Sequence, residues 1–307
     1  MPESLNSKTL IVIVGPTAIG KTALAIEVAK YFNTEIISAD SRQFYREMEI
    51  GTAKPNAKEL LAAKHHFINS HSVNELFSTG DFELEALKTI EQIFEQHDVA
   101  IMVGGSGLYI NAVVNGLDEM PEINLQIREK LNLQFEEEGI SAIQNQLKEY
   151  DPEYFEKVDQ NNPQRMIRGL EVFLSTGQKL SSMLSATKKQ RPFEIIKIGL
   201  NTDRAKLYGQ INNRVDKMVE NGLVEEVRSL IFFRKNNALN TVGYSEIFDY
   251  FDETISLNDA ISAIKQNTRR FAKRQLTWFR RDEEINWFEP NQTEQVLNLI
   301  AKNLKTV

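Results

Sequence analysis

Apolar runs alternate with amphipathic stretches over the first third of the chain. Residues 10–14 are all apolar and predict a buried strand, and apolar positions at helical spacing follow over 22–31. A second apolar run, 35–39, stops at Asp40, and a third, 99–103, stops at two glycines. Strands that alternate with helices are typical of an open α/β sheet, so we expect an α/β core built on a parallel sheet.

The alternation stops between residues 118 and 191, where the sequence becomes polar and helical in pattern. We interpret this region as an all-α insertion domain that separates a first part of the core, 1–117, from a second part, 192–307. Helices are predicted inside it at 125–138, 140–150 and 162–176. Elsewhere the pattern predicts strands at 65–68 and 193–200, and helices at 78–97, 207–228, 260–279 and 294–304.

The turn between the first strand and its helix reads GPTAIGKT. It fits G-x-x-x-x-G-K-[ST] in the context that a phosphate-binding loop requires, strand before and helix after. Backbone N–H groups and the helix N-terminus attract phosphate oxygens, Lys21 adds a full charge, and the Thr22 hydroxyl can hold Mg²⁺. This phosphate loop consists of Gly15, Pro16, Thr17, Ala18, Ile19, Gly20, Lys21 and Thr22. A nucleotide, pyrophosphate or a phosphorylated metabolite would each fit it.

Asp40 follows the second predicted strand, at the edge of the sheet where open α/β folds bind their ligands. Its carboxylate could hold Mg²⁺ or act as a general base. A structural role, as a helix cap or as the partner of Arg42, explains the position equally well. Residues 41–55 mix charged, aromatic and glycine residues and predict a functional loop with a short helix.

The composition narrows the class of protein. The 307 residues include no cysteine, which excludes disulfides, thiolate nucleophiles and cysteine-based zinc sites and fits a reducing, cytoplasmic location. No apolar stretch approaches the roughly 20 residues of a membrane span, and the first residues lack the apolar core of a signal peptide. We therefore expect no membrane contact, and nothing in the sequence indicates an obligate oligomer rather than a monomer.

The net charge of −7 hides a local asymmetry. Residues 265–281 contain seven lysines and arginines, no acid and several aromatic residues, and 164–168 form a second basic cluster. A basic helix with aromatic side chains suits contacts with a nucleic-acid backbone and stacking on bases. A solvated helix face, with Trp278 in the core, is the alternative. Residues 118–158 differ, with eleven acids against four bases.

Together, these motifs resemble those of the tRNA dimethylallyltransferases, also called tRNA isopentenyltransferases. The resemblance rests on eight segments in the family's order: GPTAIGKT (15–22), SADSRQFY (38–45), IGTAKP (50–55), GGSGLY (104–109), QRMIRGLEV (164–172), NRVDKM (213–218), VGYSEI (242–247) and KRQLTWFR (273–280). Some positions depart from the family's pattern. Ser106 stands where Thr is common, Ile19 where Ser is common, and Ser245 where Lys or Arg is frequent.

The resemblance implies a P-loop NTPase-like core whose helical insertion grips the anticodon stem-loop of a tRNA. Dimethylallyl diphosphate would give its dimethylallyl group to the exocyclic amine of the adenine just 3′ of the anticodon. Asp40 would take the amine proton, while the phosphate loop (Lys21 and Thr22 foremost), Arg214 and Mg²⁺ would hold the diphosphate. The residues expected to face the tRNA are Asp40, Ser41, Arg42, Gln43, Ser106, Arg128, Gln164, Arg165, Met166, Ile167, Arg168, Lys273, Arg274, Gln275, Trp278 and Arg280.

Two other functions fit part of the pattern. A small-molecule or nucleotide kinase would use the phosphate loop for ATP, but no acid follows the strand at 99–103 to help hold Mg²⁺. A non-catalytic RNA-binding protein would leave Lys21 and Asp40 without a role. For Arg214, an ion pair with Asp216 or Glu220 on the same helix is the structural alternative.

Overall fold

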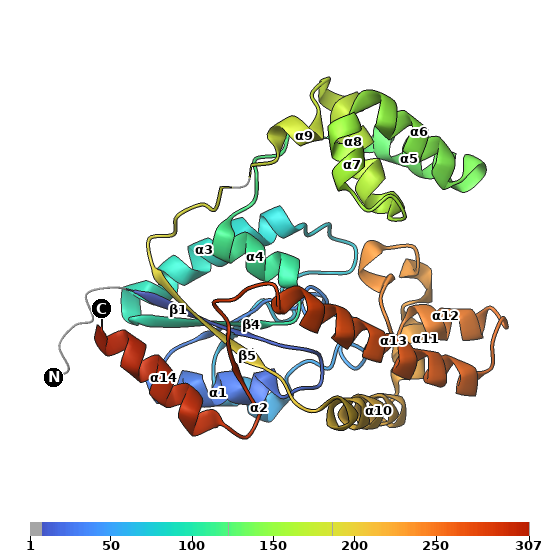
Figure 1. The fold of residues 1–307 in the computed structure, drawn as a ribbon. Helices are drawn as coiled ribbons and strands as arrows, with labels where there is room; N and C mark the ends of the chain where they lie inside the picture. The colour runs from blue at the N-terminus through green and yellow to red at the C-terminus, as the bar shows by residue number, and fades with distance from the viewer. Residues whose placement is uncertain (1–7, 122, 186, 307) are drawn as a thin grey trace. The chain divides into compact units, whose positions relative to one another are not determined.

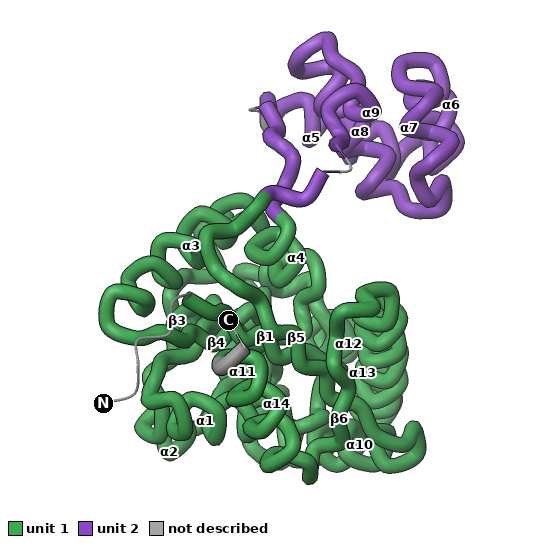
Figure 2. Tube along the Cα trace, turned by 60° about the vertical axis from the view of Figure 1, so that its left-hand side comes forward, with its two compact units in different colours: residues 1–115, 190–307 green, residues 116–189 purple. Residues whose placement is uncertain are grey.

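The computed structural model describes residues 8–121, 123–185 and 187–306. The chain divides into two compact units (Figure 2): unit 1 contains residues 1–115 and 190–307, and unit 2 contains residues 116–189. The sequence pattern had placed the insertion at 118–191. None of the helices in the described part of the chain has the length and apolarity that a bilayer crossing needs.

A six-stranded parallel sheet forms the centre of unit 1, in the order β3-β2-β4-β1-β5-β6. The strands are β1 (Thr9–Val14), β2 (Ile36–Ser38), β3 (His65–His66), β4 (Val99–Gly104), β5 (Glu194–Leu200) and β6 (Asn286–Phe288). Every residue of β1 is buried, because this strand lies between β4 and β5 and is covered on both faces. The predicted α/β core with a parallel sheet is confirmed, and β6 is a strand that the pattern missed.

Helices cover the two faces of this sheet (Figure 1). One face carries α3 (Thr79–Gln96) and α4 (Gly107–Asn115), and the other carries α1 (Lys21–Phe32), α2 (Ala57–Ala62) and α14 (Thr293–Thr306). Leu10 and Val12 of β1 belong to the core cluster under α3 and α4, whereas Ile11 and Ile13 belong to the cluster under α1 and α14. This two-residue period places apolar side chains on both faces, and each buried one contributes roughly 1.5–3 kcal/mol.

A third group of helices in unit 1 has a core of its own. It consists of α10 (Arg204–Glu220), α11 (Leu223–Ser229), α12 (Ser245–Phe251) and α13 (Leu257–Phe279), with short 3₁₀ helices at Ile231–Phe233 and Asn237–Leu239. The single helix predicted for 207–228 is wrong, because Gly222 takes a left-handed conformation, with φ 99°, between α10 and α11. The short helix expected within 41–55 is also wrong: these residues form turns, and α2 begins only at Ala57.

In the described residues of unit 2, all secondary-structure elements are helices, joined by short non-helical segments. Its helices are α5 (Leu125–Glu138), α6 (Ile140–Tyr150), α7 (Pro152–Lys157), α8 (Pro163–Thr176) and α9 (Leu180–Met183). Leu131, Ile143, Leu147 and Leu170 form the centre of its apolar core. The all-α character and the three predicted helices are confirmed, whereas the short α7 and α9 were not predicted.

Arg191 fixes the chain where it returns to unit 1. Its Nη2 lies 2.7 Å from Glu83 Oε1 and donates to the carbonyl of Ala112 at 2.8 Å, and its Nε donates to the carbonyl of Val113 at 2.7 Å. Both charged side chains are about nine-tenths buried, at 10% exposure each. Since α3 and α4 supply these partners, the strand that follows, β5, starts from an anchored point.

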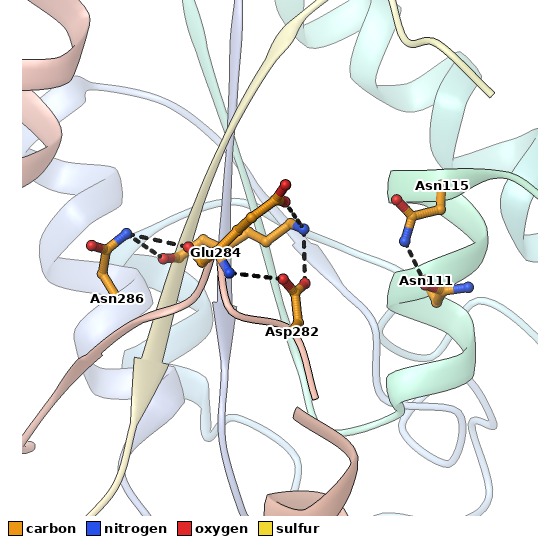
Figure 3. A network of polar contacts seen from close by, with 6 residues as sticks. Asn111, Asn115, Asp282, Glu284 and Asn286 are labelled. Atoms are coloured by element: carbon orange, nitrogen blue, oxygen red, sulfur yellow. Dashed lines mark hydrogen bonds and ion pairs between the residues drawn. The ribbon is translucent and has the colours of Figure 1, made fainter. Parts of the chain in front are cut away.

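A polar network joins β6 to β5 and thereby fixes the chain that leaves α13 (Figure 3). Lys197 Nζ lies 2.7 Å from Asp282 Oδ2 and 2.6 Å from Glu284 Oε2, and Asn286 donates to the carbonyl of Lys197 at 3.3 Å. Burial lowers the pKa of Lys197, but the two carboxylates outweigh it and raise the pKa overall. The end of α13, which borders the site described next, is therefore held against the sheet.

Candidate active site at the carboxyl end of the sheet

The phosphate loop leads from β1 into α1 through two left-handed residues, Ala18 with φ 65° and Gly20 with φ 100°. Lys21, the first residue of α1, folds back so that its Nζ donates to the carbonyl of Pro16 at 2.8 Å. A cavity of about 340 Å³, the first cavity, lies against this loop and is lined by Thr17–Thr22, Ser38, Asp40, Gln43, Arg214 and residues of the neighbouring loops. A helix N-terminus with a lysine beside such a cavity suits an anion of the size of a diphosphate.

The two cations of the first cavity are desolvated. Burial lowers the pKa of Lys21 to about 8, the Asp40 carboxylate opposes this change, and Arg214 adds to it. Burial also lowers the pKa of Arg214, and Asp40 again opposes it. Among the described residues, neither cation has a carboxylate within ion-pair distance. Because their charge lacks an equal counter-charge, an anionic ligand would stabilise both.

Arg214 is directed by its own helix, α10, toward the loop before α2. Its Nη2 donates to the carbonyl of Thr52 at 3.5 Å. Among the described residues, Arg214 forms an ion pair with neither Asp216 nor Glu220, and Asp216 lies 2.5 Å from Lys265 of α13 instead. Arg214 is thereby free to face the cavity.

Asp40 lines both the first cavity and a second one. Its Oδ1 accepts the backbone N–H of Arg42 at 3.1 Å, which fixes the turn after β2. The ion pair with Arg42 that the sequence allowed is not formed, because that guanidinium donates to the carbonyls of Asn237 and Asn240 at 3.0 and 3.3 Å. The carboxylate therefore remains available to a ligand.

Packing explains why β4 ends in a glycine, Gly104. A Cβ atom on Gly104 would lie 2.2 Å from the carbonyl oxygen of Ala39, so a side chain there would push away the segment that carries Asp40. No acid can occupy this position while Asp40 keeps its place. The absence of an acid at position 104 therefore has a packing cause, and it agrees with the sequence-based expectation that no acid follows this strand.

Gln275 of α13 joins the phosphate loop to the segment after β4. Its Nε2 donates to the carbonyl of Gly105 at 2.9 Å, and its Oε1 accepts the backbone N–H of Thr17 at 2.8 Å. The side chain is only 6% exposed. Both ends of its amide thus position backbone, and the expectation that Gln275 also faces the tRNA stays a prediction.

The second cavity has a volume of about 540 Å³ and shares Thr17, Asp40, Arg214, Phe271 and Gln275 with the first. Its remaining walls include Ser41, Arg42, Ser106, Tyr109, Val215, Met218, Ile264, Arg274 and Trp278. Ser106 Oγ accepts the backbone N–H of Ser41 at 3.0 Å, so the hydroxyl at this position has a defined use. The structure thus brings together most of the unit 1 residues expected at a tRNA site, whereas Lys273 and Arg280 are exposed outside both cavities.

The model of the IPP transferase family matches residues 43–282. The chain belongs to this family. A tRNA dimethylallyltransferase of Christiangramia forsetii is 52% identical over 98% of this chain and all of the relative, and one of Bacteroides fragilis is 45% identical over the same shares. These relatives give no support to the kinase alternative.

Solved structures of the IPP transferase family share the fold. The tRNA isopentenylpyrophosphate transferase of Bacillus halodurans is 37% identical, with a TM-score of 0.73 over 97% of each chain. A eukaryotic dimethylallyltransferase described as acting on tRNA is 28% identical, with a TM-score of 0.79 over 94% of this chain and 75% of that one. The P-loop core expected from the resemblance is confirmed.

Unit 2 contains what we call the arginine cluster, formed by Arg128, Arg168 and the neighbouring Gln164 around Glu171. The carboxylate of Glu171, 1% exposed, lies 3.5 Å from Arg128 Nη1 and 3.1 Å from Arg168 Nη1. Arg128 also donates to Gln164 Oε1 at 3.4 Å. These predicted residues therefore gather on one part of unit 2, and Glu171 is a member that the sequence did not indicate.

The other predicted residues of α8 separate by exposure. Arg165 is exposed, whereas Met166 and Ile167 are completely buried in the core of unit 2. The expectation that the latter two side chains face the tRNA is therefore wrong for this structure. The family motif assigns all of residues 164–168 to the tRNA, but successive residues of a helix point to different sides.

Proposed function

We propose that this protein transfers the dimethylallyl group of dimethylallyl diphosphate to the exocyclic amine of the adenine 3′-adjacent to the anticodon of tRNA, giving N6-(dimethylallyl)adenosine. The observation that carries the proposal is the position of Asp40 and Arg214 in the shared wall of the two cavities. One cavity offers cations to a diphosphate, and the other has room and aromatic walls for a base taken out of its stack.

In this mechanism the first cavity binds the diphosphate through Lys21, Arg214 and the N–H groups of the phosphate loop. The adenine amine attacks the allylic carbon, the new C–N bond forms as the C–O bond to the diphosphate breaks, and Asp40 takes the amine proton. The leaving pyrophosphate gains negative charge in this step, and desolvated cations stabilise such charge more strongly than exposed ones. Asp40 compensates for the low nucleophilicity of an aromatic amine.

Mg²⁺ fits the donors of the first cavity. Thr22 lines it together with Asp40, and no cluster of three or more acids and histidines suited to a metal occurs in the described residues. Mg²⁺ commonly takes one or two protein oxygens and completes its octahedron with substrate phosphates and water. The Thr22 hydroxyl would hold the ion, which would neutralise part of the diphosphate charge.

The tRNA would contact the rim of the second cavity through Ser41, Arg42 and Ser106, and α13 through Lys273, Arg274, Trp278 and Arg280. The arginine cluster and Arg165 of unit 2 would bind the backbone of the anticodon stem-loop. The monomeric state and the cytoplasmic location stay predictions.

A direct test mixes the protein with labelled dimethylallyl diphosphate, Mg²⁺ and tRNA that carries adenine next to the anticodon. Label should appear in the RNA, and nuclease digestion should place it on that adenosine. A matched tRNA with guanosine at this position should remain unlabelled. Absence of label from the first tRNA, or ATP turnover stimulated by a small metabolite, would end the proposal.

A further inference from the structure

Glu226 of α11 binds a loop of the site without lining either cavity. Its Oε2 accepts the backbone N–H groups of Glu49 at 3.0 Å and Ile50 at 2.7 Å, and its Oε1 accepts that of Gly51 at 2.9 Å. The hydroxyl of Tyr244 donates to the same Oε1 at 2.6 Å. One carboxylate thus receives four hydrogen bonds, three of them from consecutive residues.

Tyr244 closes this arrangement from the other side. Its side chain is completely buried, and burial, followed by the charge of Glu226, raises its pKa, so it stays a neutral donor. The ring packs directly on Gly51, where a Cβ atom would lie 2.5 Å from it. We call Glu226 and Tyr244 the loop clamp, since together they hold residues 49–51 by hydrogen bonds and by contact.

The loop clamp binds residues 49–51, and the next residue, Thr52, makes the hydrogen bond to Arg214. The carbonyl of Thr52 accepts Arg214 Nη2 at 3.5 Å and Gln43 Nε2 at 3.2 Å. The Thr52 hydroxyl donates to the carbonyl of Met48 at 2.6 Å, which closes the same turn. If residues 49–51 lose their acceptor, their three N–H groups must find other partners, and the carbonyl of Thr52 moves with them.

We propose that Glu226 is a positioning residue for Arg214. It fixes the turn at 49–52, and this turn places the guanidinium at the wall between the two cavities. The inference rests on the proposed function only for the identity of the anion that Arg214 meets, a diphosphate. A role of Glu226 in stability alone predicts equal losses whether or not Arg214 is present.

The test is a double-mutant cycle read by the binding of inorganic pyrophosphate in calorimetry. Glu226→Gln keeps the shape of the side chain but replaces the carboxylate by a neutral amide. We expect this variant to bind pyrophosphate about tenfold more weakly than the wild type. In an Arg214→Ala background, the same substitution should change binding by less than about twofold, because its route of action is gone. Glu225→Gln, at the exposed neighbour on α11, is the matched control and should bind as the wild type does.

Tyr244→Phe removes one hydroxyl and serves as the second variant should Glu226→Gln fail to fold. It should weaken binding about threefold with Arg214 present and leave it unchanged without Arg214. Unchanged binding in Glu226→Gln, or equal losses in both backgrounds, would overturn the inference. Because the probe is pyrophosphate alone, a wild type that binds it but modifies no tRNA defeats the proposed function and leaves this inference standing.

Discussion

The first cavity of unit 1 and the arginine cluster of unit 2 hold their cations in different ways. In the first cavity, Lys21 and Arg214 contact backbone carbonyls at 2.8 and 3.5 Å. In the arginine cluster, Arg128 and Arg168 lie 3.5 and 3.1 Å from the buried carboxylate of Glu171. Among the described residues, Lys21 and Arg214 have no carboxylate at ion-pair distance, although Asp40 acts on both from farther away, whereas Glu171 pairs with both arginines of the cluster.

This difference distinguishes a site that captures a small anion, the first cavity, from a surface that contacts RNA, the arginine cluster. A desolvated cation with no carboxylate at ion-pair distance raises the free energy of the empty protein, and an incoming anion offsets that penalty. Arg128 and Arg168 are partly exposed and keep their orientation through Glu171. Such side chains suit the weaker, salt-dependent contacts of an RNA backbone. The comparison can be tested in both regions.

The largest effect should come from Asp40→Asn. Loss of the general base should lower kcat by about 10²–10⁴-fold, whereas the tRNA dissociation constant, set by the exposed cations, should stay within about twofold of the wild type. Single-turnover prenyl transfer and a filter-binding assay on the same preparations measure the two quantities. A parallel loss of tRNA binding would contradict the division between capture and contact.

Second, the pH dependence should distinguish the two kinds of cation. Lys21 has a pKa of about 8 rather than 10.5. In the free protein it therefore loses its proton as pH rises through about 8, and pyrophosphate affinity should fall by up to about tenfold per pH unit above that value. Lys21→Arg, whose charge persists, should not show this decline, and the ratio of the two variants cancels the ionisation of pyrophosphate itself.

Unfolding provides a check on the same shift. Charged Lys21 is unfavourable in the folded state, so its penalty is full below pH 8 and disappears as pH rises toward 10.5. Lys21→Met should therefore increase the free energy of unfolding of the ligand-free protein at pH 7, and this gain should shrink at pH 10. A Lys21→Met protein that is less stable than the wild type at pH 7 would contradict the assignment.

Much of the fold follows from local pattern, because β1 and β4 are continuous apolar runs and their helices have apolar faces. Prediction from the sequence failed at Gly222, where one left-handed backbone angle ends a helix. It also failed for β6, a short strand that is held by hydrogen bonds to β5, as between Asn286 and Lys197. Neither feature has a periodicity that could be read in advance.

The site was predictable to the extent that its members lie in motifs. Lys21 was identified because it belongs to the phosphate-loop motif, and Asp40 because it follows a predicted strand at the edge where such sheets bind ligands. The inward turn of Gln275 toward Thr17 was not foreseen, since its neighbours Lys273 and Arg274 are basic and exposed, and its contact with the tRNA stays a prediction. Glu226 was missed because its four donors come from two distant segments that only the folded chain brings together.

A smaller effect is expected from Glu171→Gln. The neutral amide cannot hold two guanidinium groups as the carboxylate does, so Arg128 and Arg168 should lose their common orientation. tRNA affinity should fall about tenfold, a loss that corresponds to roughly one charge-assisted hydrogen bond. The value of kcat at saturating tRNA should stay unchanged. Glu129→Gln, at an exposed acid of α5, is the matched control. A fall in kcat without a change in affinity would show that the arginines oriented by Glu171 do not bind the RNA.

The smallest effect should come from Arg274→Ala. Arg274 is exposed on α13 and lines the second cavity, with its guanidinium 5.9 Å from the centre of the Phe271 ring. If it contacts one phosphate, tRNA binding should weaken about three- to tenfold at low salt, and the slope of log affinity against log salt should decrease by about one.

Lys88→Ala, at an exposed lysine of α3, removes the same charge from an element that lines neither cavity. It should leave the salt slope unchanged, because net charge by itself does not create a contact. If Arg274→Ala and Lys88→Ala gave the same slope, α13 would have no phosphate contact at this position. The salt dependence of tRNA binding would then come from the other proposed cations, Lys273 and Arg280 of α13 and the arginine cluster of unit 2, and the second cavity would contribute no phosphate contact through Arg274.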